Sequence, residues 1–117
     1  MHIDLIPIEQ AETHTTVAIT GSMDVVGAGA IENKFIGYTI ARKRHALVDM
    51  SGVDFLGSMG IRVFVSTAKS LSREGKKLIL FGAQPAVEKT LTMSGFSGVV
   101  PVVTTLTEAR AKIGLEG

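Results

Sequence analysis

Short apolar runs alternate with helix-like segments along most of this chain, and this alternation restricts the fold more than any other feature of the sequence. "HALVDM" (45–50) is a short apolar run of strand length, and "KLILF" (77–81) is nearly continuous, as in strands covered on both faces. Segments with helical spacing of apolar residues follow both runs. Strands that alternate with helices in this way predict an α/β fold with a mostly parallel sheet.

Two strands are expected before this alternation begins and one near its end. "HIDLIPI" (2–8) and "TTVAIT" (15–20) are joined by a polar, hairpin-like connection, and Pro7 places the first of them at a sheet edge because proline donates no ladder hydrogen bond. "VVPVV" (99–103) predicts the last strand. The sequence therefore predicts one domain over residues 1–117, with a mixed, mostly parallel sheet of about five strands and about four helices packed on it. The expected helices cover about 26–42, 58–73, 83–96 and 105–114.

Residues at the helix ends support these boundaries. Asp24 is expected to cap the first helix or lie near its cap, and Pro85 suits the first turn of the third. Gly95 is expected at the C-terminal end of that helix, and Thr105 with Glu108 has the spacing of a capping box for the fourth. The second helix is expected to bury an apolar stripe formed by Ile61, Phe64, Val65, Ala68 and Leu71.

Composition excludes several classes of function. The 117 residues include no cysteine, so neither a disulfide framework nor a cysteine metal site is expected. The formal net charge of +1 and the lack of aromatic residues at stacking intervals argue against direct nucleic-acid binding. The basic run 42–44 is interpreted as a solvated loop. No apolar run approaches the ~20 residues of a membrane-spanning helix, and the first ten residues lack a secretory signal, so a cytoplasmic protein without membrane insertion is expected.

Catalytic and cofactor motifs are weakly represented. The glycines of "VVGAGA" are followed by Glu32 where a dinucleotide-binding loop needs a third glycine, and Leu56 occupies the first glycine position of a G-x-S-x-G elbow. The histidines have no common helical spacing, and each is expected at the surface or in a loop. The sequence therefore predicts neither an enzyme nor a metal or cofactor site. The three histidines are His2, His14 and His45.

The stretch "LGSMG" (56–60) is the most informative local feature. Ser58 is expected where a loop leaves the C-terminal end of a parallel strand and enters a helix, which is where ligands and partners contact α/β sheets. Its hydroxyl is expected either to cap the helix or to serve as a modifiable switch. A cap alone does not explain Gly60, which costs ~1 kcal/mol in a helix, or Gly57 before the serine.

The order and spacing of several motifs resemble the STAS domains, named for sulfate transporters and anti-sigma factor antagonists. That family has a strand ending in Val-Leu-Asp-Leu, a Gly-Val pair, an aromatic residue and Asp-Ser-Ser/Thr-Gly opening a helix. "ITGSMD" is similar to the family's Gly-Glu-Leu-Asp, with Asp24 as its aspartate. The other counterparts here are Val48-Asp49-Met50, Gly52-Val53, Phe55, Ser58-Met59-Gly60 and Met93-Ser94-Gly95-Phe96.

The resemblance implies a regulatory binding protein. In stand-alone bacterial members, the first serine of Asp-Ser-Ser/Thr-Gly is phosphorylated by a partner that is both an anti-sigma factor and a serine kinase of the histidine-kinase-like ATPase type. The unphosphorylated antagonist binds this partner, and the phosphorylated form does not. Carried over, the phosphoacceptor is Ser58. The partner-binding surface is then expected to include Ser22, Asp24, Gly57, Met59, Gly60 and Arg62.

Three departures from the family pattern leave alternatives open. Gly57 replaces the aspartate before the phosphoacceptor, Met59 replaces the second hydroxyl residue, and Ser22 replaces the acid of Gly-Glu-Leu-Asp. The predicted surface is therefore less acidic and more apolar than the family pattern. A STAS scaffold or assembly subunit of a signalling or transport complex, without phosphorylation, is the second hypothesis. A small enzyme is the third.

Overall fold

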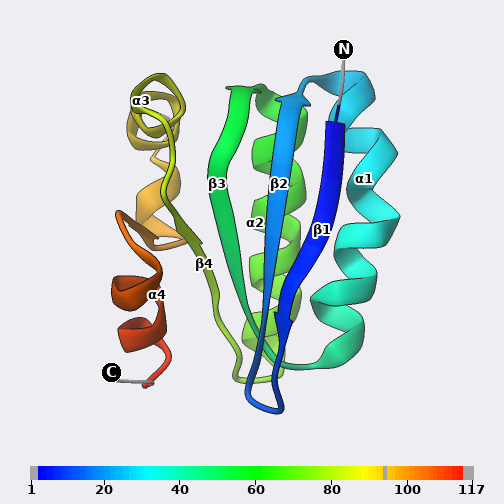
Figure 1. The fold of residues 1–117 in the computed structure, drawn as a ribbon, viewed down its shortest axis with the longest axis vertical. Helices are drawn as coiled ribbons and strands as arrows, with labels where there is room; N and C mark the ends of the chain where they lie inside the picture. The colour runs from blue at the N-terminus through cyan, green and yellow to red at the C-terminus, as the bar shows by residue number, and fades with distance from the viewer. Residues whose placement is uncertain (1–2, 94, 115–117) are drawn as a thin grey trace.

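A five-stranded sheet forms the centre of the molecule in the computed structural model, which describes residues 3–93 and 95–114 (Figure 1). The strands lie side by side in the same order as in the chain. They are β1 (Ile3–Gln10), β2 (His14–Met23), β3 (His45–Leu56), β4 (Leu78–Phe81) and β5 (Val102–Val103). The helices are α1 (Val25–Tyr38), α2 (Ser58–Arg73), α3 (Pro85–Met93) and α4 (Leu106–Lys112), with short 3-10 turns η1 (Ile40–Arg42) and η2 (Phe96–Gly98).

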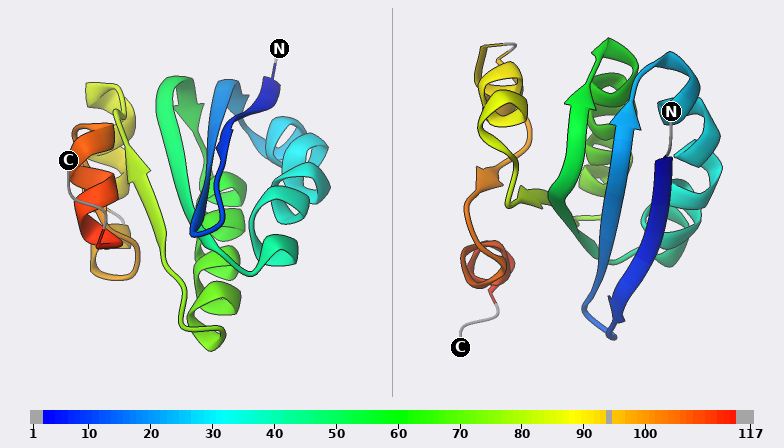
Figure 2. Two further views of the ribbon diagram at one scale, coloured as in Figure 1. Left: turned by 60° about the horizontal axis from the view of Figure 1, so that its bottom comes forward. Right: turned by 45° about the horizontal axis from the view of Figure 1, so that its top comes forward.

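Strand pairing confirms the predicted mixed, mostly parallel sheet. β1 pairs antiparallel with β2, whereas β2, β3, β4 and β5 pair in parallel. Pro7 lies in β1 at the edge of the sheet, where its missing N–H group interrupts no second ladder. The C-terminal ends of β2 and β3 lie next to each other at the same end of the sheet, beside the beginnings of α1 and α2 (Figure 2).

The main core lies between the sheet and the helices α1 and α2, which lie behind the sheet in Figure 1. Phe64 of α2 is fully buried at its centre, with its ring edge-on to Phe35 of α1 at 5.6 Å and to Phe96 of η2 at 6.2 Å between centroids. Edge-to-face aromatic contacts of this kind add to the free energy gained by burial. One aromatic side chain therefore joins three parts of the chain that are distant in sequence.

A second, smaller cluster lies on the opposite face of the sheet. Leu47 of β3 and Ile79 and Phe81 of β4 pack there against Ala109 of α4. Side chains alternate between the two faces of a strand, so these residues point away from the main core to which their strand neighbours Ala46, Val48, Leu78 and Leu80 belong. α4 therefore covers the sheet from the side opposite α1 and α2.

The structure confirms the residues predicted at helix ends, although not every predicted helix boundary. The Asp24 carboxylate accepts a hydrogen bond of 2.7 Å from the Gly27 N–H and caps α1. The Thr105 hydroxyl accepts one of 3.2 Å from the Glu108 N–H and caps α4. α3 begins at Pro85, and Gly95 follows its end with a φ of +75°, the left-handed conformation that glycine adopts without strain. Ser94 of the predicted motif lies outside the described residues.

Several element lengths differ from the prediction; for example, the third helix, predicted over 83–96, covers Pro85–Met93. The strand that begins at His45 does not stop at residue 50 but continues to Leu56, because residues 52–56 keep pairing with the end of β2 across two register irregularities. The helix predicted over 26–42 ends at Tyr38, where Thr39 leaves the helical conformation and donates its hydroxyl to the Phe35 carbonyl at 2.7 Å. Of "VVPVV", only Val102–Val103 forms a strand.

Burial differs from the prediction in two places. The inward face of α2 also contains Val63 and Thr67, whereas three residues of the predicted stripe pack against the core only partly buried: Ile61, Val65 and Ala68. His14 is 3% exposed rather than at the surface, and its ring hydrogen-bonds to Glu9 at 2.8 Å. A His buried in the fold with polar partners has a structural role, so its burial does not by itself indicate a site.

Among residues 3–93 and 95–114, no helix combines the length and hydropathy that a bilayer crossing requires. Within these ranges, no three or more His, Asp or Glu side chains come together in a group that could hold a metal ion.

Candidate functional site

The candidate site is the corner where the ends of β2 and β3 meet the beginnings of α1 and α2. Met23 pairs with Leu56 at the end of the parallel ladder, and the Gly57 N–H donates to the Met23 carbonyl at 3.0 Å. This backbone bond fixes the turn from β3 into α2. The start of α2, with Ser58, is therefore held against the turn that carries Asp24.

Ser58 is the first residue of α2, and it does not cap the helix. The N-cap is Gly57, in an extended conformation with φ of −97°, and the first backbone bond of the helix runs from the Ile61 N–H to the Gly57 carbonyl at 3.1 Å. The Ser58 side chain is exposed and makes no hydrogen bond to any described residue. The capping role considered from the sequence is therefore absent, which leaves the hydroxyl free.

Gly60 lies under the surface rather than on it. A Cβ at this position would lie 2.5 Å from Leu56 Cδ1 and 3.1 Å from Met23 Cβ, so glycine allows α2 to approach the sheet closely. Ser22 is likewise buried, at 3% exposure, and its hydroxyl has no hydrogen-bond partner among the described residues. Both were expected on the partner-binding surface, and the structure places both beneath it.

The other predicted surface residues occupy different positions at the corner. Arg62 is exposed one turn after Ser58, and no described residue forms an ion pair or hydrogen bond with it. Met59 is half-buried and packs against the main core. Asp24 is partly exposed, and one of its carboxylate oxygens caps α1. Gly57 is partly exposed next to the Phe55 ring.

Exposed apolar side chains surround this corner, and sequence reasoning did not place them in the site. Val25 and Val26, at the start of α1, are 70% and 80% exposed, and Phe55, beside Gly57, is 51% exposed. Large exposed apolar side chains that gather in one place indicate an interaction surface. The signal in the sequence is an apolar pair directly after the capping Asp24, outside the buried stripe of the helix.

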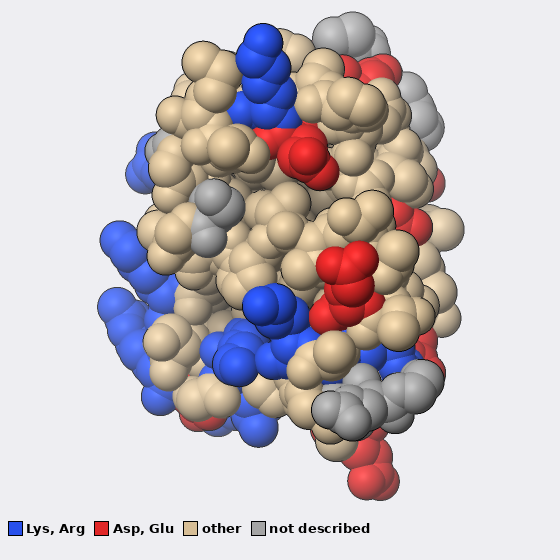
Figure 3. All heavy atoms as spheres, turned by 90° about the vertical axis from the view of Figure 1, so that its left-hand side faces the viewer, with Lys and Arg blue, Asp and Glu red and all other residues tan. Residues whose placement is uncertain are grey.

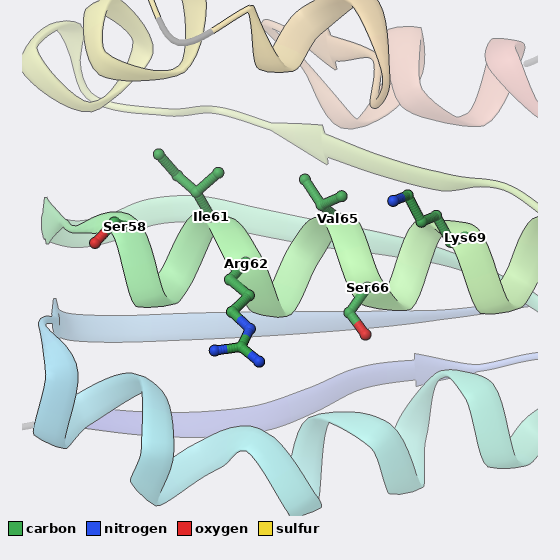
Figure 4. Close-up of a pocket in the computed structure, with 6 residues that line it drawn as sticks. All are labelled: Ser58, Ile61, Arg62, Val65, Ser66 and Lys69. Atoms are coloured by element: carbon green, nitrogen blue, oxygen red, sulfur yellow. The ribbon is translucent and has the colours of Figure 1, made fainter.

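A groove begins at Ser58 and runs along the outward face of α2 (Figure 4). It has a volume of about 420 Å³. Ile61, Val65 and Lys69 point to one side of the helix in this view, and Arg62 and Ser66 point to the other. The complete lining consists of Ser58, Ile61, Arg62, Val65, Ser66 and Lys69.

Fold and corner together define an α/β domain that presents an exposed serine at a helix start. The chain belongs to the STAS domain family, whose model matches residues 6–109. A curated relative, the anti-sigma-B factor antagonist of Listeria monocytogenes, is 24% identical over 102 residues, which cover 87% of this chain and 90% of that protein.

Solved structures show the same fold. An anti-sigma factor antagonist from Mycobacterium paratuberculosis superposes with a TM-score of 0.78 and 26% identity, over 95% of each chain. The anti-sigma factor antagonist SpoIIAA in its unphosphorylated form gives a TM-score of 0.76 at 14% identity, over 97% of this chain and all of that one. SpoIIAA of Bacillus in its phosphorylated form gives 0.68 at 17% identity, over 94% and 99%.

Proposed function

We propose that this chain is an anti-sigma factor antagonist that acts in the cytoplasm and is switched by phosphorylation of Ser58. The unphosphorylated protein binds an anti-sigma factor that is also a serine kinase of the histidine-kinase-like ATPase type, and phosphorylation releases it. Its role is binding rather than catalysis. The names of the relatives support the class of function, and one structural observation supports the switch: the Ser58 hydroxyl is exposed and takes no part in holding the fold.

A phosphate on Ser58 is expected to leave α2 folded and to weaken the docking of a partner, the two effects that a switch requires. A phosphate adds about −1.5 to −2 charges, which the N–H groups and dipole at the start of α2 tolerate. The same charge would disturb an apolar contact made through Val25, Val26 and Phe55, because the partner would have to bury it. Phosphorylation is therefore expected to weaken docking without unfolding the helix.

The test uses Ser58→Ala and Ser58→Asp with the purified kinase/anti-sigma factor of the source organism. Ser58→Ala should bind and stay unmodified with ATP, and Ser58→Asp should bind at least about tenfold more weakly because it places a charge at the contact. Ser72→Ala, a change at an exposed serine in the same helix outside the groove, is the matched control and should still gain one phosphate, measured by intact mass. Wild-type protein that binds the partner but gains no phosphate would contradict the switch.

A second function is favoured by the two residues that flank Ser58. Gly57 and Met59 replace an acidic and a hydroxyl residue of the family pattern, and the half-buried Met59 adds apolar surface next to the serine. These residues suit a STAS scaffold or assembly subunit of a signalling or transport complex that is not phosphorylated. In this case, the complex that the protein forms should keep the same composition in a pull-down before and after phosphatase treatment.

A further inference from the structure

The outward face of α2 carries positive charge without any negative charge. The sixteen residues of the helix, "SMGIRVFVSTAKSLSR", include Arg62, Lys69 and Arg73 and no Asp or Glu. Among the described residues, none forms an ion pair with any of these three cations. In Figure 3 basic side chains gather along the left edge, on the side where α2 lies, and in the lower part of the view, whereas acidic ones lie mainly toward the centre and right. The charge of α2 is therefore not neutralised within the molecule.

The groove along this face combines apolar and cationic contacts at helical spacing. Ile61 and Val65 are four residues apart and only partly buried, so they form an apolar strip along the groove. Arg62 lies beside this strip, and Lys69 lies at its far end, two helical turns from Arg62. From Ser58 to Lys69 the groove is about 16 Å long at 1.5 Å per residue, which equals about three turns of a docked helix.

We propose that this groove binds an acidic amphipathic helix of a protein partner. Apolar residues of that helix, four positions apart, would pack on Ile61 and Val65, and its Asp or Glu side chains would pair with Arg62 and Lys69. The opposite charge is what selects this occupant, because a basic or neutral helix leaves both cations unpaired. Two cations flanking an aliphatic strip also suit a helix better than nucleic acid, which requires a broader basic surface.

This inference rests on the proposed function for its regulatory consequence. Ser58 lies at one end of the groove and Arg62 is four residues later, so a phosphate on Ser58 and the guanidinium of Arg62 are within reach of one another on the helix surface. The phosphate takes up the cation that a partner carboxylate would use and repels the other carboxylates. Phosphorylation therefore acts on this groove by direct charge competition.

The test titrates the full chain with a synthetic helical peptide of about fifteen residues, bearing two leucines four positions apart flanked by glutamates. A matched peptide carries lysines in place of the glutamates. Two-dimensional ¹⁵N NMR at low salt should show shifts at Ile61, Arg62, Val65 and Lys69 with the acidic peptide only. The double variant Arg62→Glu/Lys69→Glu should lose at least about tenfold in affinity for the acidic peptide, measured by fluorescence anisotropy.

The control variant is Lys34→Glu/Lys112→Glu, which makes the same change in net charge outside the groove, on α1 beside Asp4 and on α4. It should bind like the wild type. Absence of shifts at α2, equal binding of both peptides, or equal losses in both double variants would overturn the inference. If the anti-sigma factor binds the Arg62→Glu/Lys69→Glu protein normally, the groove is wrong and the proposed function stands. If Ser58→Asp leaves that binding unchanged while the acidic peptide binds the groove, the switch is wrong and the groove stands.

Discussion

At the residue scale, the hydrogen bond that His45 accepts depends on the neutral form of its ring. Its Nδ1 accepts a hydrogen bond of 3.0 Å from the Lys77 N–H, which assigns the proton of the neutral ring to Nε2. Burial lowers the pKa of His45 from its ordinary value of 6.5, and the nearby charges of Lys76, Lys77 and His14 lower it further. The folded state therefore binds this proton less readily than the unfolded chain.

This shift predicts the direction of the pH dependence of stability. Because the folded pKa is lower, the contribution of His45 is present above pH 6.5 and is lost as pH falls from there through the lowered pKa. His45→Asn keeps an acceptor near the Nδ1 position and does not titrate, so its free energy of unfolding should fall less between pH 7 and pH 5 than that of the wild type. Urea denaturation at a series of pH values measures this, and parallel pH curves for the two proteins would contradict it.

At the scale of the element, α1 contains two glycines that differ in the space available for a side chain. A Cβ at Gly27 would collide with the Ser22 carbonyl, a backbone atom that cannot move aside, whereas a Cβ at Gly29 meets nothing within 4 Å. Gly27 thus allows α1 to begin directly against the end of β2. Gly29 has no such function and only weakens the helix.

Alanine substitution should therefore move stability in opposite directions at these two positions. Gly27→Ala should destabilise the protein by about 1–3 kcal/mol, the usual cost of overpacking, and Gly29→Ala should stabilise it by about 0.5–1 kcal/mol through helix propensity. Urea midpoints at constant slope provide the measurement. Two changes of the same sign would show that propensity or crowding alone governs both positions.

The sequence was informative about elements where the signal is local. The Asp24 cap, the Thr105 cap and the place of Pro85 in the first turn of α3 depend on residues within one turn, and all three were predicted. The extension of β3 to Leu56 depends on pairing with β2, which local pattern does not encode. In α2, Ile61 and Val65 were assigned to the buried stripe. They pack against the core but stay partly exposed in the groove, a division that the sequence alone does not encode.

The site was predictable to a similar degree. Ser58 and Arg62 lie at an exposed helix start because the β-α alternation places them there. Ser22 and Gly60 were assigned to the surface by the family resemblance, but strand alternation and the close approach of α2 bury them. The apolar residues around the corner, such as Phe55, needed the three-dimensional arrangement.

For the molecule as a whole, Phe64 connects the helical layer. Its ring contacts those of Phe35 and Phe96, so α1, α2 and η2 meet at one buried side chain. Phe64→Ala should destabilise the whole domain by about 3–5 kcal/mol, which is a large fraction of the stability of a small protein. Phe55→Ala is the matched control, because that ring is half exposed and its loss should cost less than about 1 kcal/mol.

The measurement is chemical denaturation followed by two probes, far-UV circular dichroism and the fluorescence of a dye attached away from the core. Both probes should report the same lowered midpoint for Phe64→Ala, because the core around Phe64 is shared by both helices and the sheet. Separate transitions for the two probes would mean that the helical layer and the sheet unfold independently.

The way α2 begins has a consequence for the history of this corner. The main chain of Gly57 holds the turn through its bond to the Met23 carbonyl. The side chain at position 58 is therefore not needed to hold this turn. A lineage can therefore gain, lose or replace the hydroxyl there without first acquiring compensating mutations elsewhere. Regulation at this position can evolve on its own timescale, independent of the architecture that supports it.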